Sequence, residues 1–467
     1  MRLLSFRSLS ISMIALAAVA AMPAAAQTTP DPATPAPMPA PAATPADAQA
    51  ADQSATTEAA PPADNGSDMP RTDILSKNTI SVMFDGRLAL ANGERSFTNR
   101  GLGKTRFEGT NKGDYKGYAV PVEGDLVWLP RFTPSLTANV SAAWQRDQEN
   151  AVDLLEAFVN FLPPQKGKVG FQLRAGLMWP EISMEHSTGG AWSVVNTITP
   201  STINAWVGEE VKVLGFEATV RASLGQHQLG LTGAIFAGND TSGTLLSFRG
   251  WALHDEKATA FGHFPLPPLN PFIRLLQENQ TRSLIELDNR PGFYARLDWR
   301  PPWPFGVALF YYDNRGNPEA FKPTGQWGWR TRFWNLGINA DLGASTKLLI
   351  QGMTGSTIMG FKTGGVPWVH TYFNSGFVSV TRSFGTQWAL TGRVEAFNTR
   401  EHGSEMSPLE SEDGWSTTAA VRYNLNKNVT LLAEALNVRS RRGTRALLGI
   451  DPFQAQTVFQ FGVRLRL

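Results

Sequence analysis

The sequence predicts an all-β fold, a transmembrane antiparallel up-and-down β-barrel of about 16 strands that follows a disordered N-terminal segment. Three observations support this prediction. Apolar and polar residues alternate in one segment after another from Thr79 onward, short connections alternate with long ones, and the chain ends inside an alternating segment. Successive side chains of a strand point to opposite faces, so each segment has one apolar and one polar face. A barrel turns the first toward lipid and the second toward a lumen.

The last alternating segment, Gln456 to Leu467, shows this pattern most clearly. Its apolar face carries Phe459, Phe461, Val463, Leu465 and Leu467, and its polar face carries Gln460, Gly462, Arg464 and Arg466. An unpaired strand of this kind would be a site of aggregation. We therefore expect another strand to pair with it and close the barrel.

Residues 1–26 have the three parts of a secretory signal peptide. Arg2 and Arg7 form a basic start, residues 11–22 are apolar, and Ala24, Ala25 and Ala26 precede the expected cleavage site. The alternative is a membrane anchor, but the apolar run is shorter than the roughly 20 residues that a spanning helix needs. Loss of Arg2 and Arg7 leaves 40 basic residues of the 42, against 40 acidic residues.

Residues 27–74 are rich in Pro, Ala and Thr, and no basic residue precedes Arg71 in this segment. Such a composition buries too little apolar surface to offset the conformational entropy of folding. We expect a disordered periplasmic tether, with attachment to the cell wall or to another envelope protein as an alternative. The barrel is expected to occupy residues 75–467.

Composition limits the other classes of function. The chain has no cysteine, which excludes thiolate metal sites and a cysteine nucleophile. A nearly neutral mature chain gives no reason to expect nucleic acid as a partner. No motif for a cofactor or a metal is present, so none is expected.

Sixteen segments have the length and alternation of spanning strands. We expect strands at 79–91, 119–129, 134–146, 152–162, 168–178, 210–224, 228–237, 291–300, 305–313, 330–342, 346–354, 370–383, 387–398, 414–425, 428–438 and 455–467. Short turns at 130–133, 163–167, 225–227, 301–304, 343–345, 384–386 and 426–427 alternate with longer loops at 92–118, 179–209, 238–290, 314–329, 355–369, 399–413 and 439–454, and 147–151 is the one short member of the second set. Short periplasmic turns and long extracellular loops are typical of outer-membrane barrels.

The polar faces carry charges of both signs. If these faced lipid, each arginine at the bilayer midplane would destabilise the barrel by about 2 to 4 kcal/mol. A barrel of this size can leave an aqueous channel. The loop 179–209 combines acidic residues with many apolar ones, so we expect it to fold into the channel. We expect Glu181 and Glu185 to face basic wall residues and form a constriction, although each wall charge could also pair across strands. The predicted pore-lining set is Arg174, Glu181, Glu185, Glu217, Arg221, Arg296, Arg393 and Glu395.

Three segments resemble bacterial outer-membrane porins, in particular the proteobacterial group related to the phosphate-selective porins O and P. They begin at Arg174 (RAGLMWPEISMEH), Ile198 (ITPSTINAWVGEE) and Val378 (VSVTRSFG). The resemblance implies a passive diffusion channel, often trimeric, that an inward-folded loop narrows. This chain differs in its Pro/Ala-rich tether, which stands where that group commonly has a coiled coil, and in its final Leu467, where such barrels usually end in Phe. Its lumen has few lysines, so phosphate selectivity is not carried over.

The predicted function is an outer-membrane porin for passive diffusion of small hydrophilic solutes or ions. Its expected partners are outer-membrane lipid and lipopolysaccharide, the permeant solutes and a second and third copy in a homotrimer. An outer-membrane enzyme is one alternative, with His186 and Ser187 or His402 and Glu401 as its site. A gated transporter would need a plug domain that the region before Thr79 is too short and too polar to form. A structural or adhesion barrel with an occluded lumen is the third alternative, because loop 238–290 is rich in apolar residues, for which we expect a trimer contact.

Overall fold

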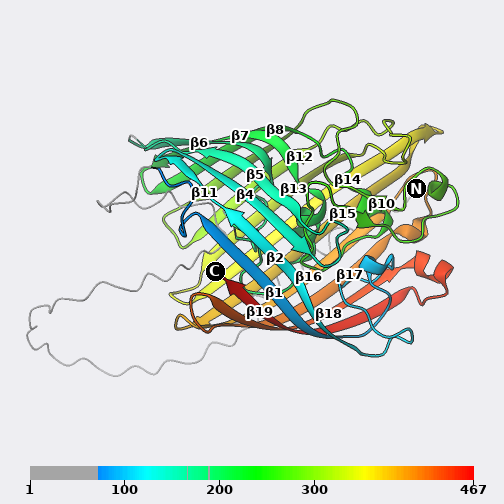
Figure 1. Ribbon diagram of the computed structural model, residues 1–467. Coiled ribbons are helices and arrows are strands. Elements are labelled where there is room, and N and C mark those ends of the chain that lie inside the picture. Colours follow the sequence, from blue (N-terminus) through cyan, green and yellow to red (C-terminus); the bar gives the residue numbers. More distant parts are fainter. Residues whose placement is uncertain (1–71, 166, 188–189) are drawn as a thin grey trace, which may run out of the picture. The chain divides into compact units, whose positions relative to one another are not determined.

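The computed structural model describes residues 72–467 except 166, 188 and 189. The predicted signal peptide and nearly all of the predicted tether lie outside these residues. The described chain forms a closed antiparallel β-barrel, with short turns at one end and long loops at the other (Figure 1). The described helices are short, and none combines the length and the hydropathy of a membrane span.

The barrel wall consists of sixteen long strands within the described residues, as the sequence predicts. They are β1 (Ile80–Ala91), β2 (Lys116–Trp128), β4 (Leu136–Gln145), β5 (Asp153–Phe161), β6 (Val169–Met178), β7 (Val213–Leu224), β8 (His227–Ala237), β11 (Gly292–Arg300), β12 (Phe305–Asp313), β13 (Arg330–Asp341), β14 (Thr346–Thr363), β15 (Val366–Phe384), β16 (Trp388–Glu401), β17 (Glu412–Asn424), β18 (Val429–Arg442) and β19 (Phe453–Arg466). A short segment, β3 (Arg131–Thr133), pairs with β4 beside the end of β2.

The first and last strands close the barrel. β1 pairs antiparallel with β19, and Leu88 lies opposite Phe461. Val82 and Leu467 exchange two backbone hydrogen bonds of 2.9 Å, so the terminal residue belongs to the seam. The edge that the C-terminal segment would otherwise expose is therefore paired, as the alternation predicts.

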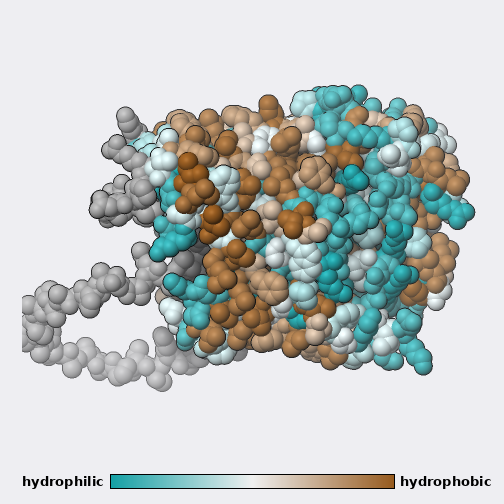
Figure 2. All heavy atoms as spheres, in the orientation of Figure 1, coloured by the Kyte–Doolittle hydropathy of each residue, from teal (hydrophilic) through white to brown (hydrophobic). Residues whose placement is uncertain are grey.

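The wall has an apolar outer face. On β13, the side chains of Trp334 and Leu336 are about half exposed, whereas the alternate residues Phe333 and Asn335 are buried. Apolar residues cover much of the barrel in Figure 2, and hydrophilic residues gather toward the end with the long loops. Aromatic pairs lie near both ends of the outer face: Tyr311 with Trp334 at 4.6 Å on the loop side, and Trp388 with Tyr423 at 4.3 Å on the turn side. Such rings suit the two headgroup regions of a bilayer.

The prediction of a loop at 355–369 is wrong. Strands β14 and β15 continue through this region and meet at Gly364 and Gly365, whose φ angles are +59° and +85°. Two adjacent residues with positive φ form the tight hairpin turn that matches the twist of paired strands, and glycine adopts it without strain. This hairpin extends beyond its neighbours at the loop end of the barrel (Figure 1).

The remaining elements belong to the long loops. They are α2 (Thr202–Glu210), α3 (Thr244–Phe248), the two-residue strands β9 (Phe264–Pro265) and β10 (Gln280–Thr281), and the 3₁₀ turns η1 (Phe97–Asn99), η2 (Ile273–Leu275), η3 (Pro408–Glu410) and η4 (Gly443–Leu448). The segment that holds α2 and the loop that holds α3 contribute most to what fills the barrel.

Candidate channel constriction

The segment between β6 and β7, residues 179–212, crosses the lumen, and we call it the lumen segment. Its backbone contacts strands that lie on the other side of the barrel from β6 and β7. Glu434 of β18 accepts hydrogen bonds from the backbone of Ile198 at 2.7 Å and of Thr199 at 3.0 Å. Arg464 of β19 donates to the carbonyl oxygen of Val194 at 2.6 Å. Polar groups of the wall thus satisfy backbone groups of the segment that would otherwise be buried without partners.

Glu181 lies between two arginines of the wall. Its Oε1 is 3.2 Å from Nη1 of Arg174, and its Oε2 is 3.8 Å from Nη1 of Arg296. Arg174 also forms a bidentate ion pair with Glu217, at 2.7 and 2.9 Å. Arg296 pairs with Asp298 at 2.7 Å and donates to the backbone oxygen of Glu181. Glu181 therefore holds this end of the lumen segment to the wall through both its carboxylate and its backbone carbonyl oxygen.

Glu185 is the second acidic residue of the segment that meets the wall. Its Oε1 is 2.7 Å from Nη1 of Arg393, whose guanidinium also donates to the carbonyl oxygens of Thr199 and Pro200. Its Oε2 accepts from Oγ of Ser201 and Nδ2 of Asn204, both at 2.6 Å. All of these groups are buried, so removal of one would leave a charge without its partner in a site that water does not reach.

Helix α2 begins at this cluster. Ser201 is its N-cap residue and accepts a hydrogen bond from the backbone of Asn204. The next residue, Thr202, donates from its backbone to Glu395 of β16 at 2.8 Å. Carboxylates are favourable at a helix N-terminus, because the first backbone N–H groups lack partners within the helix. The wall therefore fixes both the start and the direction of α2.

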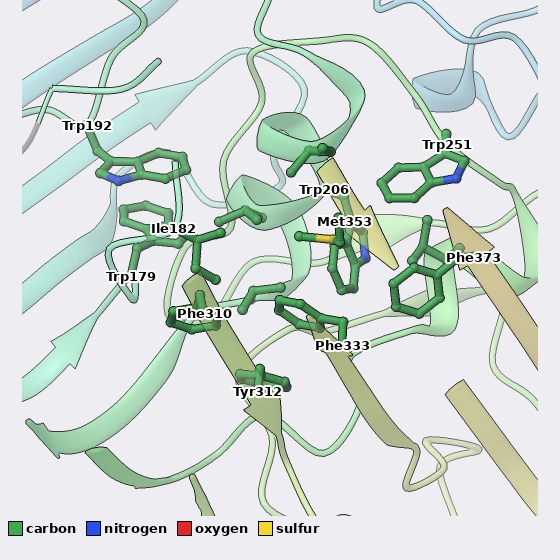
Figure 3. Packing of buried hydrophobic residues seen from close by; sticks show 14 of the residues in the cluster. Trp179, Ile182, Trp192, Trp206, Trp251, Phe310, Tyr312, Phe333, Met353 and Phe373 are labelled. Carbon is green, nitrogen blue, oxygen red and sulfur yellow. The ribbon is translucent and has the colours of Figure 1, made fainter. Parts of the chain in front are cut away.

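The apolar residues of the lumen segment pack into a core inside the barrel. Trp206 of α2 lies between inward-facing aromatic side chains, with ring centroids 5.3 Å from both Phe333 and Phe373. Figure 3 shows these rings together with Trp251, Phe310 and Tyr312. Trp206 and Trp251 are almost completely buried. Of the apolar residues of this segment that we expect to prefer burial, Trp192, Val194, Ile198 and Ile203 are buried, whereas Val195 is only partly buried. The part of the lumen toward the long loops is packed.

A buried ion pair joins α2 to the loop that carries α3. Arg249 binds both oxygens of Glu209, at 2.7 and 2.6 Å, and Nε2 of His254 lies 2.8 Å from Oε1 of Glu209. Burial raises the pKa of Glu209, but Arg249 and His254 lower it further, to about 2. A carboxyl whose pKa falls on folding stabilises the folded state above its unfolded pKa, and this stabilisation is lost as the pH decreases toward the folded pKa.

Replacement of Glu209 by glutamine is therefore expected to destabilise the protein at neutral pH by on the order of 2 kcal/mol, because charge-assisted hydrogen bonds are lost. The difference from the unchanged protein should shrink as the pH falls from about 4.5 to about 2. Thermal unfolding across this range measures it. Glu319→Gln, at an exposed loop position, is the control. A difference that does not depend on pH would contradict the role of the ion pair.

Two hollows lie where the lumen segment meets the turn-side halves of β11–β16. One, of about 50 Å³, is lined by residues that include Glu181, Ser183, Arg296 and Asn339, and the other, of about 90 Å³, by residues that include Glu185, Thr197, Asp341 and Lys347. Met184 lines both. It comes so close to β13 at Gly337 that a Cβ on this glycine would lie only 2.7 Å from the Sδ of Met184. The side chain of Met184 thus stands between two polar hollows.

Met184→Ala is expected to join the two hollows and to raise the unitary conductance of the protein in a planar bilayer. The physical reason is that alanine lacks the side-chain atoms that separate them, while the ion pairs of Glu181 and Glu185 remain. Leu336→Ala is a matched control on the outer face of β13, where a change meets lipid. An unchanged conductance in Met184→Ala would show that the path for ions does not pass this side chain.

The predicted pore-lining residues fall into two groups in the structure. Arg174, Glu181, Glu217 and Arg296 lie together, and Glu185, Arg393 and Glu395 form a separate cluster on the other side of the lumen. Arg221 donates to Gln172 at 2.8 Å. Among the described residues, the ion pairs of Glu181 are those with Arg174 and Arg296. The sequence analysis did not identify α2 or the inward-facing aromatic residues, although Ser201 is a typical N-cap residue of a helix.

His186, one of the two histidines proposed for an enzyme, has a partner other than Ser187. Nδ1 of His186 is 2.8 Å from Oγ of Ser183, whereas Ser187 donates to the backbone of Ser193. Oγ of Ser183 also accepts from the backbone N–H groups of Glu185 and His186, both at 3.2 Å. This pattern is typical of a serine that stabilises a turn.

The apolar residues of loop 238–290 are partly buried within the chain itself. Phe264, Leu266 and Ile273 belong to a core with Trp327 and Trp329, so the predicted trimer contact does not apply to these three. Leu275 is exposed.

Comparisons with protein families and with curated protein sequences find no match. Solved structures similar to the chain include the outer-membrane channel DcaP of Acinetobacter baumannii, with a TM-score of 0.49 and 9% identity over 84% of this chain and 99% of that one. An anion-selective porin from Comamonas acidovorans has a TM-score of 0.43 and 11% identity over 83% and 99%. OmpF of Salmonella typhi has a TM-score of 0.44 and 10% identity over 85% and 100%. Similarities with identities this low and TM-scores below 0.5 do not assign the chain to a family, so membership of the phosphate-selective porin group stays a prediction.

Proposed function

We propose that this protein is an outer-membrane porin for passive diffusion of small hydrophilic solutes or ions, and that the lumen segment narrows its channel. The observation that carries the proposal is the position of Glu181 and Glu185, which meet Arg174, Arg296 and Arg393 inside a closed barrel with an apolar outer face. Charged side chains of both signs beside a narrow path select solutes by charge and size.

The proposed path is narrow. The inner face of the wall is packed against α2 and α3 in its loop-side half. The two polar hollows lie in its turn-side half. Short turns face the periplasm in such barrels, so the hollows would form a vestibule open to that side. The conductance should be lower than the barrel diameter alone implies.

The proposal is tested by recording the purified protein in a planar bilayer under a salt gradient. Discrete ohmic steps support a diffusion channel, and the reversal potential reports whether cations or anions pass. Steps that group in threes would support the homotrimer that we propose as its assembly. A correctly folded barrel without steps would sink the proposal and favour the adhesion alternative.

We propose no catalytic activity. The competing hypothesis, an outer-membrane enzyme whose site includes His186, has a direct test. Hydrolysis of phospholipid or peptide by the purified protein, abolished in His186→Ala, would overturn our assignment.

A further inference from the structure

A second segment of the chain lies inside the barrel, nearer the long loops than the lumen segment does. It follows β8 and carries α3, and we call residues 239–260 the cover segment. All of its residues are buried except Asp255, which is partly buried. On β18 it contacts Arg442 at the loop end, whereas the lumen segment contacts Glu434, further toward the turns. The two segments therefore lie at different depths of the lumen.

The cover segment is attached to the wall at successive strands. Oγ of Ser247 lies 2.8 Å from Oγ1 of Thr371 in β15. Nε1 of Trp251 donates to the carbonyl oxygen of Asn398 in β16 at 3.0 Å. Arg442 of β18 donates to the carbonyl oxygen of Ser247, also at 3.0 Å. These bonds satisfy polar groups that the segment buries, so each of them holds it in place.

The attachment continues past the seam of the barrel. Asp255 lies 2.7 Å from Arg87 of β1. The backbone of Lys257 exchanges two hydrogen bonds with the side chain of Gln145 in β4, at 2.9 and 3.0 Å. The strands concerned, β15, β16, β18, β1 and β4, follow one another in this order around the barrel. The cover segment thus runs along the inner wall for much of the circumference.

Helix α2 lies against the cover segment and completes a packed layer. The backbone N–H group of Ala258 donates to the carbonyl oxygen of Gly208 in α2 at 2.8 Å. The rings of Trp206 and Trp251 meet edge to face, with centroids 6.0 Å apart (Figure 3). Both segments belong to one hydrophobic core with aromatic residues of the wall. A solute that enters from the long loops meets this layer before it reaches the polar hollows beside Met184.

We propose that the cover segment is the gate of the channel. The path for solutes is closed while this segment lies against the wall, and it opens when the segment moves away from the wall. This inference rests on the proposed function, since a gate needs a channel, and it assigns separate roles to the two inner segments. The lumen segment sets the size of the current step, and the cover segment sets the fraction of time for which the path is open.

Asp255 is the residue of the cover segment that water reaches. Its carboxylate lies 2.7 Å from Arg87 and 3.0 Å from Arg106. Each arginine has a second carboxylate partner, Asp85 for Arg87 and Asp147 for Arg106, both at 2.8 Å. A neutral side chain at position 255 therefore loosens the cover segment but leaves neither arginine without a partner.

Asp255→Asn is expected to raise the ratio of open to closed time by about tenfold or more, because each charge-assisted hydrogen bond contributes about that factor to an equilibrium. The size of the current step should not change, since Glu181 and Glu185 keep their partners. Single-channel recording measures both quantities. Glu319→Gln, which removes an exposed carboxylate from another loop, is the control. An unchanged ratio in Asp255→Asn would overturn the gate.

A reversible cross-link tests the gate from the other direction. The chain contains no cysteine, and the side-chain oxygens of Ser247 and Thr371 lie 2.8 Å apart, so Ser247→Cys/Thr371→Cys places two thiols within reach of a disulfide. The matched control is Thr219→Cys/Thr232→Cys. Its side-chain oxygens also lie 2.8 Å apart, but they join two strands of the wall, β7 and β8. Thiol labelling of the denatured protein reports whether each disulfide has formed.

Oxidation of the Ser247→Cys/Thr371→Cys protein is expected to reduce its open time by about tenfold or more, because a disulfide typically contributes more than the free energy of a tenfold change. A reductant should restore the current, and the control should respond to neither. Equal currents in both states would overturn the gate while the channel stands. So would thiols that stay free in this pair when those of the control are lost, because Ser247 would then not lie against the wall. Absence of current from all of these proteins would overturn the gate together with the proposed channel.

Discussion

Replacement of Arg393 by glutamine is expected to loosen the lumen segment around Glu185 and to raise the unitary conductance. Arg393 pairs with Glu185 and Glu395 and also binds the carbonyl oxygens of Thr199 and Pro200. Without it, two buried carboxylates face each other unpaired, and loss of one partner of a buried pair costs about 3 to 5 kcal/mol. Planar-bilayer recording measures the conductance, and thermal unfolding measures the loss of stability.

Two further variants make this result specific. In Glu185→Gln/Arg393→Gln the buried negative charge of Glu185 is also removed, so part of the stability should return while the conductance stays high. Arg382→Gln changes an arginine on the lipid face and should alter neither measurement. If Arg393→Gln lost stability but kept the conductance of the unchanged protein, the lumen segment would not be the narrowest part of the path.

Trp206→Ala is expected to have the second large effect. Trp206 packs against Phe333, Phe373 and Trp251, and its Nε1 donates to Glu210 at 2.7 Å. Its removal leaves a cavity in the core of the lumen, and such truncations cost about 3 to 5 kcal/mol. The unfolding temperature should fall, and current steps should become larger or noisier because α2 is held less firmly.

The control for this variant is Trp303→Ala. Trp303 is 57% exposed in the turn between β11 and β12, where it stacks on Phe305 at 5.9 Å. Its loss should change the unfolding temperature little and the conductance not at all. An equal effect of both substitutions would mean that Trp206 matters only as one more aromatic residue.

Much of the wall could be predicted from the sequence because its signal is local. Lipid on one side and lumen on the other impose alternation with period two, so Trp334, Leu336 and Ile338 mark their strand without knowledge of its neighbours. The exception was 355–369, where the alternation continues with small and polar residues. Gly364 and Gly365 carried the hairpin signal that corrects it.

The interior of the barrel was less predictable, because its contacts join residues far apart in the chain. The pairs of Glu181 with Arg174 and of Glu185 with Arg393 follow from charge complementarity and could be proposed from the sequence. Inward-facing aromatic residues such as Phe333 and Phe373 could not, since an aromatic residue in a strand is equally suited to lipid. Only the position of Trp206 between them shows that this part of the lumen is packed.

The most direct test of the channel is single-channel recording of the refolded mature protein, side by side with Arg393→Gln, in a planar bilayer under a salt gradient. We predict small, discrete, ohmic steps for the unchanged protein and larger steps for the variant. Heat-dependent migration in gel electrophoresis shows whether each protein is folded. Absence of current from both folded proteins would contradict a diffusion channel that the lumen segment narrows.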